Sequence, residues 1–365
     1  WGVAGDVEGG GGGGGPPPPQ VSGVAFDGYL SGCEVLVDAN GNDVINNFER
    51  FDSRVYTDDS GRFTLPTLVD NFQGVIRVVP GTNCNDTSTL LPLKTTLYAP
   101  QGAVVVSPLT TVMYVAMQNL GISFAEALAN TTEALSINSF FDISREDSVA
   151  QAAFSSMARD AQVRIAQIAN VVAVGIAADG ATNANAANNA GKDLYDTLTF
   201  TAFEALYARK NLTFPSSRKL LQTLPALIDL TKSQDIVKSL GFNEITSLAE
   251  LPPSLAAKIS SASDIPIYVG AMGDAVARGN QGVAAVAEQG IEGLSSGAAS
   301  RLNFQQQMDS VSSVIQNDIA AQVAALVYGD QTLDGFNNAT STNAIHAAAV
   351  KQADVLVASL PLPPP

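Results

Sequence analysis

Side chains that carry oxygen recur between residues 38 and 49 at a spacing that could hold a divalent cation. Counted from the first of them, the ligand positions 1, 3, 5, 7, 9 and 12 of an EF-hand-type loop fall on Asp38, Asn40, Asn42, Val44, Asn46 and Glu49. Calcium takes about six to eight oxygen ligands, and this register supplies them from side chains, one backbone carbonyl and a closing carboxylate. The spacing therefore predicts a Ca²⁺ site.

The loop departs from the usual pattern at position 6, where Asp43 stands in place of the glycine that makes the sharp turn. Aspartate tolerates the left-handed backbone region better than most residues but still at a steric cost. We therefore expect a dissociation constant on the order of 0.1 to 1 mM. The alternative is a metal-free turn that folds through its own Asx side chains.

The two cysteines, Cys33 and Cys84, are an even number compatible with one disulfide, although two buried thiols would leave the same sequence. N-glycosylation triplets, each with threonine at the third position, begin at Asn85, Asn130, Asn211 and Asn338. Chance produces some of these triplets in a chain rich in Asn and Thr. Together with the cysteines, and with Trp1 in place of a start Met, they favour the secretory route and N-linked glycans.

The sequence contains few candidate catalytic residues. The single histidine, His346, lies in a helical pattern with no second metal ligand nearby, and the chain contains no GxSxG nucleophile motif. The glycine run over residues 9–15 lacks the lysine of a phosphate-binding loop. We expect a protein that is not an enzyme, and keep as the remaining alternative a minor enzyme on a helical scaffold, which a broad hydrolase screen could expose.

The charge and the apolar runs of the chain argue against nucleic acid and the bilayer as partners. The 365 residues carry a formal charge of −16, from 35 acidic and 19 basic residues, with no Lys/Arg cluster. Nucleic-acid binding needs such a cluster to release counterions, so we expect no nucleic-acid partner. The longest strongly apolar run, residues 171–178, is far shorter than the roughly 20 residues that cross a bilayer, so we expect no membrane span.

Short apolar or alternating runs separated by turn residues predict seven strands, over residues 21–26, 33–37, 54–57, 62–65, 74–79, 94–98 and 103–106. At Ser107 and Pro108 the pattern changes to helical, with an N-cap serine and a proline at the first helical position. Further helices are expected over residues 154–172, 192–209, 225–240, 248–261, 283–294, 304–327 and 344–360, with a surface loop over 182–191. The fold predicted is α+β: a seven-stranded antiparallel β-sandwich over 21–106, of immunoglobulin-like type, followed by an Ala-rich helical domain over 107–360.

Both ends of the chain are rich in Gly or Pro. Residues 1–20 combine a glycine run with four prolines, Pro16 to Pro19, and residues 361–365 are mostly proline. Such segments do not pack into a core. We interpret residues 1–20 as a linker or a docking arm, residues 361–365 as a tail, and both as places where O-glycans could be attached.

One resemblance covers roughly residues 21–178. Residues 28–42, GYLSGCEVLVDANGN, and 57–65, TDDSGRFTL, resemble the prealbumin-like or SdrD B-type β-sandwich modules of bacterial surface proteins. Those modules carry an aspartate-asparagine-glycine calcium loop followed by a TDxxGxF hairpin, and residues 107–113, SPLTTVM, are similar to the helix start that follows such a module. The resemblance implies a stalk, adhesin or fibre component with four calcium ligands, Asp38, Asn40, Asn42 and Glu49.

The Pro-rich ends and the glycosylation triplets resemble an algal cell-wall or flagellar-hair glycoprotein. We therefore expect a secreted structural subunit of a filament or surface fibre, which binds copies of itself through its arm or a sheet edge. The alternative is a monomeric calcium-dependent adhesive or carbohydrate-binding module, whose partners are glycans or cell-wall components.

Overall fold

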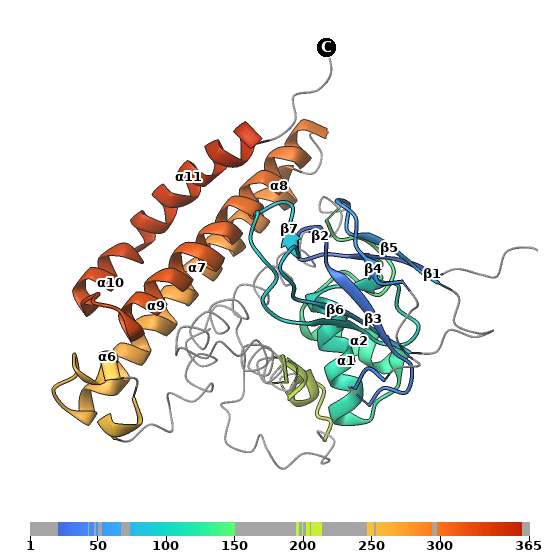
Figure 1. Cartoon of the computed structure of the whole chain (residues 1–365), viewed down its shortest axis with the longest axis horizontal. Coiled ribbons are helices and arrows are strands. Elements are labelled where there is room, and N and C mark those ends of the chain that lie inside the picture. The colour runs from blue at the N-terminus through green and yellow to red at the C-terminus, as the bar shows by residue number, and fades with distance from the viewer. Residues whose placement is uncertain are drawn as a thin grey trace, which may run out of the picture.

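The computed structural model describes residues 21–42, 44–46, 49, 53–66, 74–149, 195–196, 199, 202–204, 206–213, 247–251, 253–293 and 298–359. The helices predicted over 154–172 and 225–240, the loop predicted over 182–191, and both terminal segments lie outside these residues. In the described part the strands come first and most helices follow, so the α+β class is confirmed (Figure 1).

The described strands are β1 (Val21–Ala25), β2 (Leu30–Ser31), β3 (Glu34–Asp38), β4 (Val55–Tyr56), β5 (Arg62–Leu65), β6 (Val75–Val79), β7 (Asn85–Asp86), β8 (Leu97–Ala99) and β9 (Val105–Val106). Each of the seven predicted strands has a counterpart in this set. The short strands β2 and β7 were not predicted, because two residues are too few to show alternation.

The strands form two larger sheets, with the orders β5-β1-β9 and β4-β3-β6-β8, and a small sheet β2-β7. In the four-stranded sheet β3 pairs with β6 from Glu34 opposite Val79 to Asp38 opposite Val75. Val35 and Val37 are fully buried, whereas the alternate residues Glu34 and Leu36 are partly exposed. This period of two is what a half-covered strand requires.

The prediction that all strand pairs are antiparallel is wrong at one place. Strand β1 pairs with β9 in parallel, with Val24 opposite Val105 and Ala25 opposite Val106. Antiparallel neighbours can be joined by a tight hairpin, but parallel neighbours need a long crossover connection. Here the crossover is the whole segment between β1 and β9, which contains strands β2 to β8.

Helix α1 (Pro108–Leu120) starts where the Ser-Pro pair predicts, with Ser107 as its N-cap and Pro108 in the first turn. The hydroxyl of Thr110 donates to the carbonyl of Tyr98 at 2.8 Å, and the hydroxyl of Thr111 accepts from the Tyr98 N–H at 2.9 Å. The ring of Tyr114 stacks on that of Tyr98 with centroids 4.7 Å apart. Helix α1 therefore shares its core with strand β8.

Helix α2 (Phe124–Ala134), which was not predicted, begins with a capping box between Ser123 and Glu126. The helical residues 206–209 lie beside it, as Asn130 and Tyr207 are hydrogen-bonded and Glu133 pairs with Lys210. Helical residues among 195–209 agree with the helix predicted over 192–209.

The later elements are the 3₁₀ turn η4 (Leu248–Glu250), α6 (Pro253–Ala256), the 3₁₀ turn η5 (Ala262–Asp264), α7 (Ile265–Gly293), α8 (Ala298–Ser313), the π-helical segment η7 (Val314–Ile319), α9 (Ala320–Tyr328), α10 (Leu333–Ala339) and α11 (Thr342–Ser359). The helix predicted over 248–261 is wrong, because Pro253 cannot continue the turn that precedes it and the chain divides into short pieces. Helices α7 and α11 pack along α8 (Figure 1).

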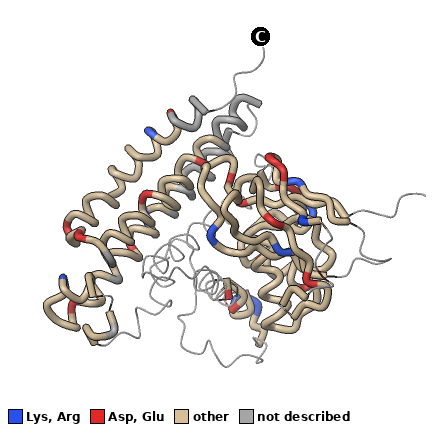
Figure 2. The backbone as a smooth tube through the Cα atoms, in the orientation of Figure 1, with Lys and Arg blue, Asp and Glu red and all other residues tan. Residues whose placement is uncertain are grey.

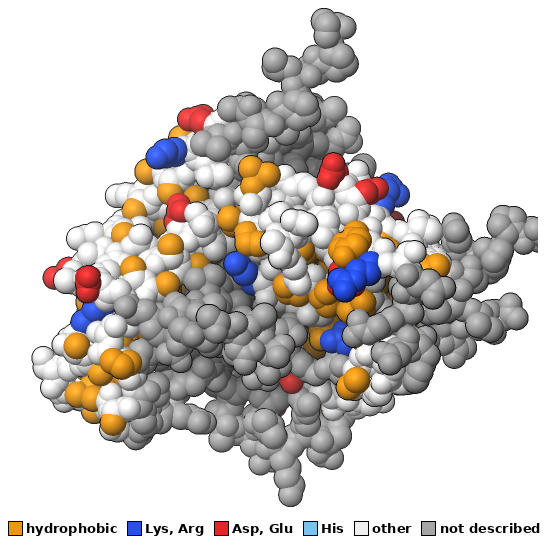
Figure 3. All heavy atoms as spheres, viewed as in Figure 1, with side chains coloured by type: hydrophobic (Ala, Val, Ile, Leu, Met, Phe, Trp, Pro, Cys, Tyr) orange, Lys and Arg blue, Asp and Glu red, His pale blue; other side chains and the backbone are white. Residues whose placement is uncertain are grey.

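Charged residues are spread along both the strand region and the helices, with no basic cluster among the described residues (Figure 2). On the face seen in Figure 3, apolar, acidic and basic side chains occur in small separate groups. None of the helices in the described part is long and apolar enough to span a bilayer.

Candidate functional site

The candidate calcium loop begins at the end of β3, where the side chain of Asp38 is only 1% exposed. Its Oδ1 accepts hydrogen bonds from the N–H groups of Gly41 at 2.7 Å and Asn42 at 3.2 Å. Gly41 has a φ of +69°, which glycine adopts without strain. The first predicted ligand therefore also folds the turn that follows it.

The two asparagines continue this pattern. Oδ1 of Asn40 accepts from the N–H of Asn42 at 3.0 Å, and Oδ1 of Asn42 accepts from the N–H of Val44 at 2.9 Å. Each bond reaches two residues along the chain, which is the geometry of an Asx turn. Positions 1, 3 and 5 of the predicted register thus stabilise consecutive backbone turns.

Glu49, the predicted closing carboxylate, returns to the start of the loop and is also 1% exposed. Its Oε2 accepts from the N–H of Asn46 at 2.7 Å and its Oε1 from the N–H of Ala39 at 3.0 Å. The Asn46 N–H is the main reason that the pKa of Glu49 lies below its ordinary value; burial opposes this shift, and the Ala39 N–H adds to it. The carboxylate of Glu49 is therefore ionised at neutral pH.

These contacts give a partial fit to calcium. The structure brings positions 1 and 12 to the same stretch of backbone, residues 39–42, as a calcium loop requires. An amide oxygen that accepts one N–H, as Oδ1 of the asparagines at positions 3 and 5 does, still has a second lone pair for a cation, whereas Oδ1 of Asp38 accepts two N–H groups. Within the described residues, however, no group of three or more His, Cys, Asp or Glu could hold a metal. Val44 is 56% exposed, and Asp43 lies outside the described residues.

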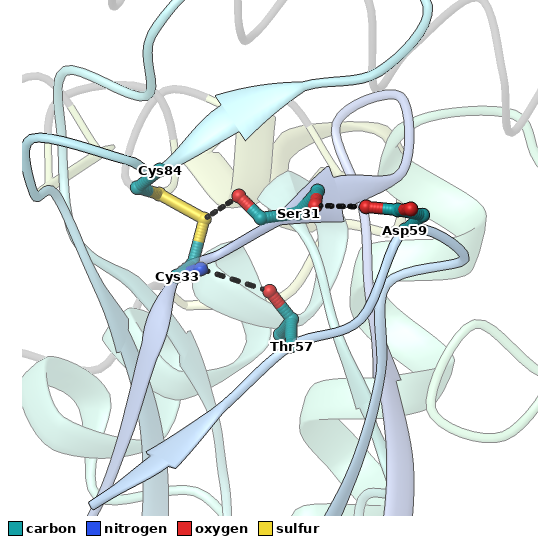
Figure 4. Close-up of a disulfide and its surroundings, with 5 residues drawn as sticks. All are labelled: Ser31, Cys33, Thr57, Asp59 and Cys84. Atoms are coloured by element: carbon teal, nitrogen blue, oxygen red, sulfur yellow. Dashed lines mark hydrogen bonds between the residues drawn. A yellow bond between two sulfur atoms is a disulfide. The ribbon is translucent and has the colours of Figure 1, made fainter.

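The disulfide lies one strand away from this loop. Cys33 and Cys84 are bonded at an S–S distance of 2.04 Å, and both are fully buried (Figure 4). The N–H of Cys33 donates to the hydroxyl of Thr57 at 3.0 Å, and the hydroxyl of Ser31 donates to Asp59 at 2.7 Å. The bond connects the chain just before β3 to the chain just before β7. In this structure the cysteines are paired, and not two free thiols.

Asp86 is a second buried carboxylate that the sequence analysis did not identify. It is 4% exposed; Oδ1 accepts from the N–H and hydroxyl of Ser88, and Oδ2 from the hydroxyl of Thr89 at 2.9 Å and the N–H of Gly28 at 3.2 Å. A Cβ on Gly28 would meet Oδ1 of Asp86 at 2.0 Å, so this position needs glycine. The Asp-x-Ser-Thr spacing was the available signal, since such side chains fold turns.

The four glycosylation triplets occupy different surroundings. Asn85, Asn211 and Asn338 are exposed, whereas Asn130, a residue of α2, is half-buried beside Tyr207. His346 lies on the exposed side of α11.

Two cavities of about 220 and 250 Å³ flank the π-helical segment η7. The first lies between η7 and helices α9, α10 and α11, and small apolar side chains such as Ala344 and Ala348 line much of it. The second is lined by Leu91, Pro92 and Lys94 from the strand region and by Gln316 and Asn317 from η7. Among the described residues that line them, none form an acid–base pair within one cavity.

Comparison with other proteins adds no relationship: the chain matches no protein-family model, no curated protein and no solved structure. The function must therefore be argued from the geometry of the chain itself.

Proposed function

We propose that the chain is a structural subunit of an extracellular glycoprotein filament or surface fibre. The observation that carries this proposal is the buried disulfide between Cys33 and Cys84. Disulfides persist in oxidising compartments and are rare in the cytosol. Exposed acceptor asparagines at 85, 211 and 338 and the net charge of −16 support the same location, because an acidic, glycosylated surface suits a crowded extracellular assembly.

In this proposal the two larger sheets form a β-sandwich of the prealbumin-like type. Core side chains of both sheets, such as Val35 and Val78 of one and Phe63 and Leu65 of the other, belong to one buried cluster that also includes helical residues, and a sandwich requires such a shared core. Strand β5 is the longest outer strand of the described sheets, as β4, β8 and β9 are two or three residues long. It is the strand to which a neighbouring subunit could add.

Deletion of residues 1–20 tests the assembly. If this segment is the docking arm, the shortened chain should fold, oxidise its disulfide and remain monomeric in sedimentation, while the full chain forms filaments visible by electron microscopy. A matched control deletes only residues 361–365. Filaments of normal length from the chain lacking residues 1–20 would rule out the arm and leave the β5 edge to be tested by a proline at Thr64.

A calcium-dependent adhesive or carbohydrate-binding module is the second candidate, and the convergence of Asp38 and Glu49 favours it. Asp38, Asn40, Asn42 and Glu49 would hold the ion, with the backbone carbonyl of Val44 and Asn46 completing the set. Calcium would neutralise two buried carboxylates and stiffen the loop. Glycan binding on an array should then depend on calcium and disappear with a chelator.

The loop itself is tested by thermal unfolding in 5 mM calcium chloride and in chelator, conditions chosen to exceed a dissociation constant on the order of 1 mM. Wild-type protein should melt at a higher temperature in calcium, and Glu49→Gln should lose the difference. Asp354→Asn, a charge change at an exposed position of α11, is the control and should keep it. Equal melting temperatures of the wild type in both conditions would exclude the calcium loop.

A further inference from the structure

The fold places the four glycosylation triplets in environments that differ in access to both the asparagine and the threonine. At the most open triplet, Asn211 and Thr213 are both exposed, and Asn211 has a φ of +55° just beyond a helix end. Asn85, the first residue of β7, and Thr87, just after this strand, are also both exposed. In these two triplets a sugar on the asparagine would extend into solvent.

In the triplet at Asn338 the asparagine is exposed to solvent but the threonine is not. Thr340 is fully buried; its hydroxyl donates to the carbonyl of Phe336 at 2.9 Å and accepts from Arg278 Nη2 at 3.1 Å. Transfer to Asn338 must therefore precede the packing of α10 against α7. The finished fold nevertheless accommodates the sugar, because the modified side chain itself stays outside.

Asn130 is the opposite case. It is half-buried, and its Nδ2, the atom that a sugar would modify, donates to the hydroxyl of Tyr207 at 3.3 Å. Thr132 is 8% exposed and its hydroxyl donates to the carbonyl of Leu128 at 2.7 Å. The ion pair between Glu133 and Lys210 lies one turn further along the same contact. A sugar on Asn130 would occupy the space where α2 meets residues 206–210.

We propose that the folded protein carries N-linked oligosaccharides on Asn85, Asn211 and Asn338 and none on Asn130. The inference rests on the proposed secretory location. The donor is an oligosaccharide linked to a lipid pyrophosphate: a bond forms from Asn Nδ2 to C1 of the first sugar, the C1–O bond to pyrophosphate breaks, Nδ2 loses one proton, and the lipid pyrophosphate leaves. A chain modified at Asn130 before folding could not close α2 onto Tyr207.

The experiment uses the full chain secreted from a eukaryotic cell and separated by size exclusion under non-reducing conditions. Peptide N-glycosidase in heavy-oxygen water converts each glycosylated asparagine to a labelled aspartate, which peptide mass mapping locates. We expect label at residues 85, 211 and 338 and unmodified asparagine at 130. Asn130→Gln should leave the mass of the intact glycoprotein almost unchanged, whereas the matched variant Asn211→Gln should lose one whole glycan.

The outcomes separate this inference from the proposed function. Label at residue 130 in the folded, oxidised fraction, whether monomer or filament, would overturn the inference and leave secretion standing. Absence of label at one of the other three positions would also overturn it. Absence of label at all four positions would overturn both the inference and the glycoprotein proposal.

Discussion

The strand region and the C-terminal helices are held together by different kinds of contact. In the strand region a disulfide joins residues 51 apart, and buried carboxylates accept N–H groups from other parts of the chain: Asp86 from Gly28, 58 residues away, and Glu49 from a residue 10 positions away in the same loop. In the helices shape also matters, because a glycine allows close packing where Gly279 of α7 meets Ile315 of η7.

Polar side chains satisfy helix ends in both regions. Serines cap the first turns of α1 and α2, and Thr332 caps that of α10. Among the C-terminal helices, two carbonyls also receive side chains from other elements: Lys258 donates to the carbonyl of Leu326 at 2.7 Å, and Arg278 donates to that of Thr340 at 2.7 Å. The two regions therefore differ in the disulfide and buried carboxylates of the strand region and in the close approach of α7 to η7, and not in how their helices are capped.

The largest effect should come from the disulfide. Replacing Cys33 and Cys84 with alanine frees a loop of about 50 residues in the unfolded chain, so the free energy of unfolding should fall by about 4 kcal/mol. Urea unfolding followed by circular dichroism measures this. Each single replacement should lower the free energy of unfolding by nearly as much as the double replacement, because either one removes the whole disulfide. If the losses of the two single variants instead add up to that of the double variant, burial of the side chains and not the disulfide accounts for the stability.

The close helix contact should respond to one added methyl group. A Cβ on Gly279 would meet Cγ1 of Ile315 at 2.7 Å, whereas one on Gly282 meets Cγ1 of Val311 at an ordinary 3.5 Å. Gly279→Ala should destabilise by about 1 to 2 kcal/mol through overpacking. Gly282→Ala should stabilise by up to about 1 kcal/mol, because alanine favours helix more than glycine does. Equal effects in urea unfolding would contradict the shape argument.

Glu49 tests whether the strand region depends on ionised links. Its folded pKa lies below the ordinary value of 4.5, so its contribution to stability is complete above that pH and is lost as pH falls through the folded pKa. Glu49→Gln should lower the free energy of unfolding at pH 7 by about 1.5 kcal/mol. It should also flatten the pH dependence of stability below 4.5, measured by urea unfolding at a series of pH values.

The control is Asp354→Asn on the exposed side of α11, which should leave both the stability at pH 7 and its acid dependence almost unchanged. If Glu49→Gln also leaves the free energy of unfolding and its pH dependence unchanged, the carboxylate of Glu49 does not stabilise the loop.

The parts of the fold that were predicted correctly have local causes. Alternation in residues 34–38 and the Ser107-Pro108 pair act within a few residues, so they are visible in the sequence. The parallel pair β1-β9 joins residues about 80 positions apart, and no local pattern encodes it. The start of α7 was missed: the helix predicted to begin at residue 283 begins at Ile265 and runs through Gly279, which packs closely against Ile315.

For the candidate site the spacing predicted that Asp38 and Glu49 would come together, and the structure brings them to the same backbone stretch. Spacing could not show that their oxygens also accept backbone N–H groups, because an Asx turn and a cation use the same oxygens. Asp86 was missed since its partner Gly28 lies 58 residues away.

The smallest effect concerns α2, where the two threonines Thr131 and Thr132 offer a matched pair. The hydroxyl of Thr131 is fully buried and has no hydrogen-bond partner among the described residues, whereas that of Thr132 donates to Leu128 at 2.7 Å. Valine has nearly the same shape, so Thr131→Val removes an unsatisfied group and should raise the free energy of unfolding by about 1 kcal/mol. Thr132→Val removes a made hydrogen bond and should lower it by about 1 kcal/mol, with thermal unfolding as the measurement. A loss in both variants would mean that the Thr131 hydroxyl binds a buried water, and that this helix, like the strand region, is held by a polar link and not by shape alone.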